Sequence, residues 1–153
     1  MIAVSRAATA GGEVEEVYPR ERIGEALAAA DAVVICTSSD PTSFHLIGAD
    51  ALAAMKPAAV LVNVARGNIV EGAALLAALK AGRLAGAALD VTEVEPLPPE
   101  SPLWDAPNLI LSPHIAGGGS TGYPQQKALF AKNLARYVAG EPLLNVCRIP
   151  PAK

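Results

Sequence analysis

Short apolar runs alternate along this chain with longer stretches rich in alanine and leucine. The runs of strand length cover residues 2–6, 30–38, 58–65, 84–91 and 108–114. Nearly continuous apolar runs are typical of strands in a parallel sheet whose two faces are both covered by helices. In "AAVLVNVA", at 58–65, only Asn63 interrupts the run. The pattern therefore predicts an α/β fold built from repeated strand–helix units.

The stretches between and after these runs have helical periodicity. The predicted helices cover residues 20–30, 48–55, 71–82 and 125–140. Pro57 ends the second of them and Gly82 caps the third, because proline cannot continue a helix and glycine adopts the left-handed cap conformation readily. The last helix carries an apolar stripe near one face, formed by Leu129, Phe130, Leu134, Tyr137 and Val138.

Polar candidates gather directly after the predicted strands. The segments concerned read "SR" (5–6), "TSSDPTS" (37–43), "VARG" (64–67), "LDVTEVEP" (89–96) and "SPHIAGGGSTG" (112–122). In an open parallel sheet, ligands bind at the carboxyl ends of the strands. The opposite strand ends carry nothing comparable, so we expect the functional site at the carboxyl edge.

Length, charge and cysteine content narrow the class of protein. A chain of 153 residues with 52% hydrophobic residues can bury one core, so we expect one compact unit. A net charge of -3 without clustered Lys or Arg argues against nucleic acid, and no apolar run has the length of a membrane span. Cys36 and Cys147 suggest reduced, structural cysteines, and no metal site is indicated. We expect a cytoplasmic protein.

Several motifs, taken in their order along the chain, resemble those of the D-isomer-specific 2-hydroxyacid dehydrogenases, in particular their glyoxylate/hydroxypyruvate reductase-like members. The most specific parts are "LIGADALAAMKPAAVLVNVARGNIVEGAALLAALKAGRLAGAALDV", "EVEPLPPESPLWDAPN" and "SPHIAGG". The resemblance is collinear from about Met1 to Val146, and separated motifs in the right order rarely arise by chance. It implies that residues 1–153 are a partial NAD(P)-binding domain with a Rossmann-like, doubly wound parallel sheet.

The resemblance also assigns catalytic roles. Arg66 matches the arginine that holds the substrate carboxylate and polarises the reacting carbonyl, a task suited to a planar and permanently charged guanidinium. Gly67 beside it leaves room for a ligand. His114 matches the general acid/base, and Glu95 matches the carboxylate that orients its imidazole. Glu93 is the rival partner, and the choice of Glu95 rests on its place directly before Pro96.

The other histidine, His45, is interpreted as structural or surface. A lone arginine at a strand end is ordinarily a surface charge, and a lone loop glutamate is ordinarily solvated. A functional role is nevertheless favoured for Arg66, Glu95 and His114, because they follow three successive strands of one predicted sheet.

Cofactor contacts are carried over in the same way. On the adenosine side the resemblance assigns Ser5, Arg6, Thr37, Ser38, Ser39 and Ser43. Toward the nicotinamide it assigns Val64, Ala65, Arg66, Asp90, His114, Ala116 and Gly117. Asp90 would bind the carboxamide, or alternatively cap backbone groups of its own loop. Ser5 and Arg6 stand where NAD-selective members place an acid, so a 2′-phosphate fits better and NADP is favoured over NAD.

The sequence departs from the family at its start. No GxGxxG turn follows its first strand, although that turn binds the pyrophosphate in the family. The chain begins at what resembles the second strand of the fold. We therefore expect a truncated piece without the first strand, the phosphate turn and the N-terminal substrate domain. Because the missing strand is central, its absence should leave an unpaired apolar slot.

The resemblance implies reduction of short 2-oxoacids such as glyoxylate or hydroxypyruvate, with hydride from NADPH and a proton from His114. Formate or phosphite oxidation on the same scaffold is an alternative, and Glu95 argues against the formate branch, where a glutamine partners the histidine. A non-catalytic, corepressor-like module that senses nucleotide, or an inactive fragment, also fits the residues. A homodimer is implied by the resemblance alone.

Overall fold

The computed structural model describes residues 1–5, 11–118 and 122–146. Its contacts divide the chain into two units, Met1–Ile115 and Ala116–Lys153. The sequence predicts one compact unit, and the difference arises in the last long helix. There most of the large apolar side chains that the sequence places near one face of the helix are exposed, among them Phe130 at 70% and Tyr137 at 72%.

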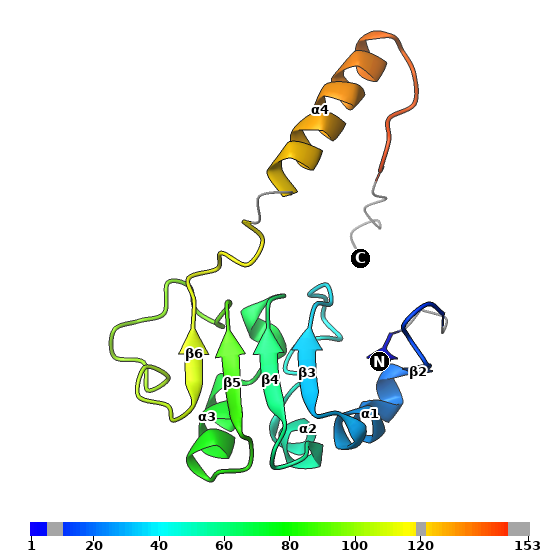
Figure 1. The fold of residues 1–153 in the computed structure, drawn as a ribbon. Helices are drawn as coiled ribbons and strands as arrows, with labels where there is room; N and C mark the ends of the chain where they lie inside the picture. Colours follow the sequence, from blue (N-terminus) through cyan, green and yellow to red (C-terminus); the bar gives the residue numbers. More distant parts are fainter. Residues whose placement is uncertain (6–10, 119–121, 147–153) are drawn as a thin grey trace. The chain divides into compact units, whose positions relative to one another are not determined.

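The first unit is built on a four-stranded parallel sheet with the order β3-β4-β5-β6 (Figure 1). Its strands are β3 (Ala32–Ile35), β4 (Val60–Asn63), β5 (Gly86–Leu89) and β6 (Leu109–Leu111). Each lies inside a run that the hydrophobic pattern predicts as a strand. The α/β class and the parallel sheet are thus confirmed.

A second, two-stranded parallel sheet pairs β1 (Ile2–Val4) with β2 (Glu16–Tyr18). The sequence pattern did not predict β2, because "EVY" is too short and too polar to stand out. Among the residues that the structure describes, β3 has β4 as its one strand partner. The division between the two sheets falls between β1 and β3, which is where the family resemblance places the central strand.

The helices of this unit are α1 (Ile23–Ala29), preceded by the 3-10 turn η1 (Arg20–Arg22), then α2 (Ala49–Ala54) and α3 (Gly72–Lys80). Another 3-10 turn, η2 (Gly67–Ile69), leads from β4 toward α3. Leu61 of β4, Ile69 and Leu75 of α3 are completely buried between sheet and helices. This layer is the hydrophobic core of the unit.

The opposite face of the sheet is exposed, with Val34 at 59% and Ile110 at 69%. The sequence predicts cover on both faces, and the strand order explains the difference. The strands follow one another across the sheet in chain order, β3-β4-β5-β6. Each right-handed crossover therefore passes on the same side, and α2 and α3 lie on the same face. Cys36 follows Ile35, whose side chain faces the core, so it points to the other side and is exposed rather than structural. The prediction for Cys147 lies outside the described residues.

The second unit contains α4 (Gly122–Val138) and the segment after it. This segment is held against the helix by Asn133, whose Oδ1 accepts the Leu144 N–H at 2.8 Å and whose Nδ2 donates to the Leu144 carbonyl at 3.1 Å. Within the described part of the chain, no helix has both the length and the apolar character needed to cross a membrane.

Candidate active site

Arg66 lies directly after β4, where the turn is shaped by Asn63. The Asn63 side chain is completely buried; its Oδ1 accepts the Ala65 N–H at 3.0 Å and its Nδ2 donates to the Arg66 carbonyl at 2.9 Å. Asn63, the one polar residue in the apolar run at 58–65, therefore stabilises the turn that carries Arg66. The Arg66 side chain is exposed, and its Nη1 donates to the Ala65 carbonyl at 2.7 Å.

Gly67 brings this turn into contact with the loop after β5. A Cβ at Gly67 would lie 2.0 Å from the carbonyl carbon and 2.0 Å from the carbonyl oxygen of Thr92. Neither backbone can yield by rotating a side chain, so only glycine permits this approach. The close contact joins the arginine turn to the segment that carries Glu95.

Glu95 pairs with His114. Its Oε2 lies 2.8 Å from His114 Nδ1, and its Oε1 accepts the Thr92 N–H at 3.0 Å. The hydrogen bond with His114 lowers the pKa of the Glu95 carboxyl below its ordinary value, and the Thr92 N–H and the charge of Arg66 act in the same direction against a weaker opposing effect of burial. Glu95 therefore stays ionised at neutral pH, within electrostatic reach of the arginine.

The backbone of His114 has φ of 55°, in the left-handed region. Its N–H donates to the Asp90 carbonyl at 2.8 Å and to the Ser112 carbonyl at 3.1 Å. Asp90 is 6% exposed, and its Oδ1 accepts the Ser112 hydroxyl at 2.5 Å and the Ile115 N–H at 3.0 Å. These two contacts of Asp90 Oδ1 are with the segment after β6 and not with the loop that follows β5 directly after Asp90.

Glu93, the rival carboxylate, pairs with the other histidine. Its Oε2 lies 2.8 Å from His45 Nε2, and its Oε1 accepts the Gly72 N–H at the start of α3 at 2.7 Å. Burial raises the pKa of Glu93, but the bonds from Gly72 and His45 outweigh it and the net pKa is lowered. The Phe44 ring stacks on His45, with centroids 3.9 Å apart. This second pair was not predicted from the sequence, although Glu93 and His45 are both visible there.

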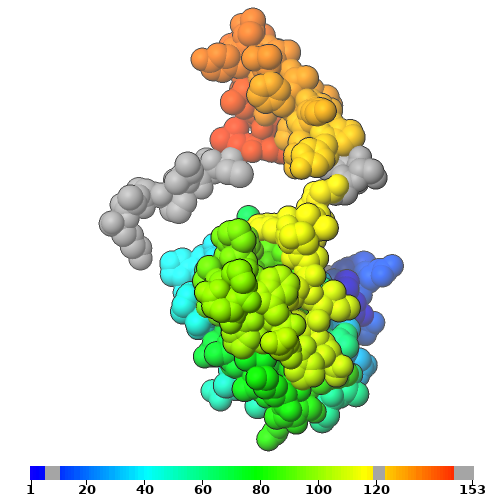
Figure 2. All heavy atoms as spheres, turned by 90° about the vertical axis from the view of Figure 1, so that its left-hand side faces the viewer, coloured from blue at the N-terminus to red at the C-terminus, as the bar shows by residue number. Residues whose placement is uncertain are grey.

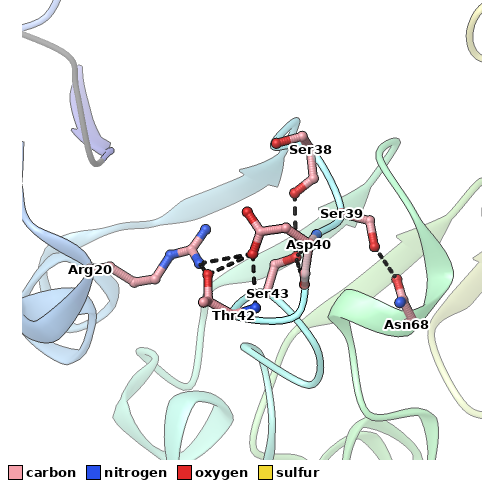
Figure 3. A network of polar contacts seen from close by, with 7 residues as sticks. All are labelled: Arg20, Ser38, Ser39, Asp40, Thr42, Ser43 and Asn68. Carbon is pink, nitrogen blue, oxygen red and sulfur yellow. Dashed lines mark hydrogen bonds and ion pairs between the residues drawn. The ribbon is translucent and has the colours of Figure 1, made fainter. Parts of the chain in front are cut away.

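The loop after β3 is closed by its own polar side chains (Figure 3). The Ser43 hydroxyl donates to the Ser38 and Asp40 carbonyls at 3.3 and 2.9 Å and accepts the Asp40 N–H at 2.8 Å. Arg20 bonds to Thr42 and lies 3.8 Å from Asp40 Oδ1. Ser43 is completely buried, so its predicted cofactor contact does not fit its position.

The other predicted cofactor residues lie in different settings. Thr37 is half-buried, while Ser38 and Ser39 are exposed on the loop after β3, where the Ser39 hydroxyl donates to Asn68 Oδ1 at 3.1 Å. Val64 is 40% exposed and Ala65 is buried. Ser5 follows β1 and donates its N–H to the Tyr18 carbonyl at 3.1 Å. Arg6 lies outside the described residues.

Ala116 and Gly117 open the second unit and are exposed. The loop from residue 92 to 107, drawn in yellow-green in Figure 2, covers the side of the first unit that carries β6 in Figure 1. Among the described residues, no group of three or more His, Cys, Asp or Glu side chains is placed to hold a metal ion. In the part of the chain that the structure describes, the two His–Glu pairs are the acid/base candidates, and Arg66 is the candidate cation for an anionic group.

This chain is similar to known proteins in both sequence and structure. A glyoxylate reductase of Thermofilum pendens is 40% identical over 143 residues, which are 92% of this chain and 40% of that protein. A D-isomer specific 2-hydroxyacid dehydrogenase of Xanthobacter autotrophicus Py2, solved with NADPH and MES, superposes with a TM-score of 0.84 at 38% identity, covering 95% of this chain and 59% of that one.

An NADPH-dependent glyoxylate/hydroxypyruvate reductase of Sinorhizobium meliloti, solved with NADP and sulfate, superposes with a TM-score of 0.80 at 30% identity, covering 94% of this chain and 46% of that one. The chain thus spans about half the length of these three proteins, from 40% to 59%. The family model for the D-isomer specific 2-hydroxyacid dehydrogenase NAD binding domain matches residues 1–116, which end one residue after the first structural unit. This chain belongs to the D-isomer specific 2-hydroxyacid dehydrogenase family and carries its NAD binding domain.

Proposed function

We propose that this chain is the nucleotide-binding and catalytic part of an NADP-dependent oxidoreductase that reduces short 2-oxoacids such as glyoxylate or hydroxypyruvate. The observation that carries the proposal is the His114–Glu95 pair at 2.8 Å, formed by the segments after β5 and β6. Arg66 follows the neighbouring strand β4, and its charge acts on Glu95. An acid/base pair and a cation that can bind a carboxylate thus belong to one sheet edge.

The protonation state of the His114–Glu95 pair follows from the ionisation of Glu95, the hydrogen-bond acceptor. Glu95 has a lowered pKa, so at neutral pH it is a carboxylate that can only accept hydrogen bonds. The hydrogen between it and His114 therefore belongs to Nδ1 of the imidazole. Nε2 is then the ring atom that gives a proton to the carbonyl oxygen during reduction and takes it back during oxidation.

Arg66 would bind the carboxylate of the 2-oxoacid. Its guanidinium stays charged at any working pH, and its planar donors match two carboxylate oxygens. This orientation would set the neighbouring carbonyl toward His114. A bound nicotinamide supplies the hydride that completes the reduction.

The residues at the strand ends fit such a cofactor in part. Thr37, Ser38 and Ser39 offer hydroxyls after β3, and Val64 offers an exposed apolar contact after β4. Ser5 and Arg6 would accommodate a 2′-phosphate, which favours NADP, and solved relatives that bind NADPH or NADP support this choice. Ser43, fully buried, is left out of the proposed contact set.

Steady-state assays of the longest natural protein that contains this sequence test the proposal. We expect NADPH oxidation with glyoxylate or hydroxypyruvate, and a higher kcat/KM for NADPH than for NADH. A preference for NADH would overturn the cofactor choice, and no oxidation with any short 2-oxoacid would overturn the activity. If NADP binds without turnover and a protein partner is retained when His114 is substituted, the corepressor-like alternative is correct.

We also propose a cytoplasmic homodimer for the whole protein, on the strength of the family resemblance alone. Size-exclusion chromatography with light scattering tests the dimer, and a mass of one chain in solution would contradict it.

A further inference from the structure

The segment that carries His114 is held at both of its ends by one oxygen atom. Asp90 Oδ1 accepts the Ser112 hydroxyl at 2.5 Å, before Pro113 and His114, and the Ile115 N–H at 3.0 Å, after them. The Asp90 carbonyl in addition accepts the His114 N–H at 2.8 Å. The chain between residues 112 and 115 is therefore fixed to the end of β5, by Asp90 and by the Leu89 carbonyl, which accepts the Ser112 N–H at 3.0 Å.

Asp90 is a firm support for this segment. It is 6% exposed, it follows β5 directly, and its own N–H donates to the Asn63 carbonyl at 3.0 Å. Both bonds to Oδ1 join Asp90 to the segment after β6, one through the Ser112 side chain and one through the Ile115 backbone. The ends of β4, β5 and β6 are joined in this way through residues 63, 90 and 112.

His114 needs such a support. Its φ of 55° is a strained conformation for a residue other than glycine, and it persists only where the surroundings hold it. The ring itself is 48% exposed, so packing holds it loosely. The direction in which the ring points, and with it the bond to Glu95, depends on the backbone from 112 to 115.

We propose that Ser112 is a positioning residue, whose hydroxyl bond to Asp90 Oδ1 fixes the 112–115 segment so that His114 Nδ1 meets Glu95. The claim that Ser112 supports catalysis rests on the proposed function. The claim that it positions the His114–Glu95 pair rests on the geometry alone. Ser112 donates to Oδ1 through its side chain, whereas Ile115 donates through its backbone. Serine 112 is thus the position where the support can be removed by substitution.

The test measures the pKa of the Glu95 carboxyl by carbon-detected NMR in the longest natural protein that contains this sequence, without substrate, with the resonance assigned by its loss in Glu95→Gln. The variants are Ser112→Ala, which removes the hydroxyl, and Ser112→Thr, which keeps it. Ser101→Ala is the matched control, since the Ser101 hydroxyl bonds within the 92–107 loop, to the Leu103 N–H at 3.4 Å.

In Ser112→Ala we expect the pKa of Glu95 to rise toward the ordinary carboxyl value of about 4.3, because the bond from His114 is the largest cause of its lowering. Ser112→Thr and Ser101→Ala should keep the value of the parent chain. A folded Ser112→Ala protein with an unchanged Glu95 pKa overturns the proposal. If this variant does not fold, Ser112→Cys replaces it, with a partial rise expected from a weak donor, and no rise overturns the proposal equally.

A second measurement connects the inference to catalysis. In the active protein, Ser112→Ala should lower kcat by about 10-fold to 100-fold with a much smaller change in KM, since displaced acid/base groups lose rate rather than substrate binding. Because the Glu95 pKa is measured without turnover, failure of the proposed reduction leaves that result standing. A changed pKa with no activity would reject the proposed function and keep the positioning role.

Discussion

His114 Nδ1 lies 2.8 Å from Glu95 Oε2, although the two residues belong to segments that follow different strands of the sheet. Two residues earlier, Glu93 Oε2 lies at the same 2.8 Å from His45 Nε2. One short loop therefore supplies carboxylates to two histidines. The surroundings of the two pairs differ. The charge of Arg66 acts on Glu95, whereas Glu93 accepts a hydrogen bond from the first N–H of α3.

The first prediction concerns His114 as the proton donor. His114→Asn keeps a polar side chain but removes acid/base capacity, so kcat for glyoxylate or hydroxypyruvate should fall by about 100-fold to 10,000-fold. His45→Asn is the matched control and should keep most of the turnover. Equal loss in both variants would contradict separate roles for the two His–Glu pairs.

The second prediction concerns pH and Glu95. Because the pKa of Glu95 is lowered in the folded protein, its ionised form stabilises the fold above the pKa of the unfolded chain, about 4.3. This stabilisation is lost as the pH falls through the lowered folded value. Glu95→Gln should therefore decrease the free energy of unfolding in urea more at neutral pH than in strong acid.

His114→Asn provides the control for this experiment, since it removes the largest cause of the lowered pKa. In that background, Glu95→Gln should have a smaller effect whose dependence on pH is flatter. A destabilisation by Glu95→Gln that grows as the pH falls would have the wrong sign and would contradict the prediction.

The third prediction concerns Gly67. A Cβ there would lie 2.0 Å from the Thr92 backbone, so Gly67→Ala must displace one of the two turns and should destabilise the protein by about 1–3 kcal/mol. The same substitution at Gly24 of α1 meets no atom within 4 Å and should be neutral or stabilising, because alanine favours the helix. Thermal unfolding of both variants measures the contrast, and a Gly67→Ala protein as stable as Gly24→Ala would refute the close approach.

The fourth prediction distinguishes the two faces of the sheet. Leu61→Ala, at a completely buried position, should lower the free energy of unfolding by about 2–5 kcal/mol. Val34→Ala, at a position that is 59% exposed, should change it by less than about 0.5 kcal/mol. Urea unfolding of the two variants is the measurement. A large loss in Val34→Ala would show that the exposed face is covered in solution.

Much of the fold was predictable because short apolar runs and helical periodicity are local properties of the chain. The strands β3, β4, β5 and β6 lie inside predicted runs, and α2 and α3 lie inside predicted helices. What failed was the assumption that an apolar run is buried on both sides. Val34 and Ile110 satisfy that pattern in sequence but are exposed, since burial depends on which elements pack on a face.

By itself, the sequence determined the strand–helix order, the family, and the expectation that Arg66, Glu95 and His114 share the carboxyl edge of one sheet. The tertiary structure decided the partners: Glu95 bonds to His114, Glu93 bonds to His45, and Asp90 bonds to Ser112. The physical reason is that hydrogen bonds form between groups brought within about 3 Å, and such distances between residues far apart in the chain arise only when the strands have paired and their loops have packed.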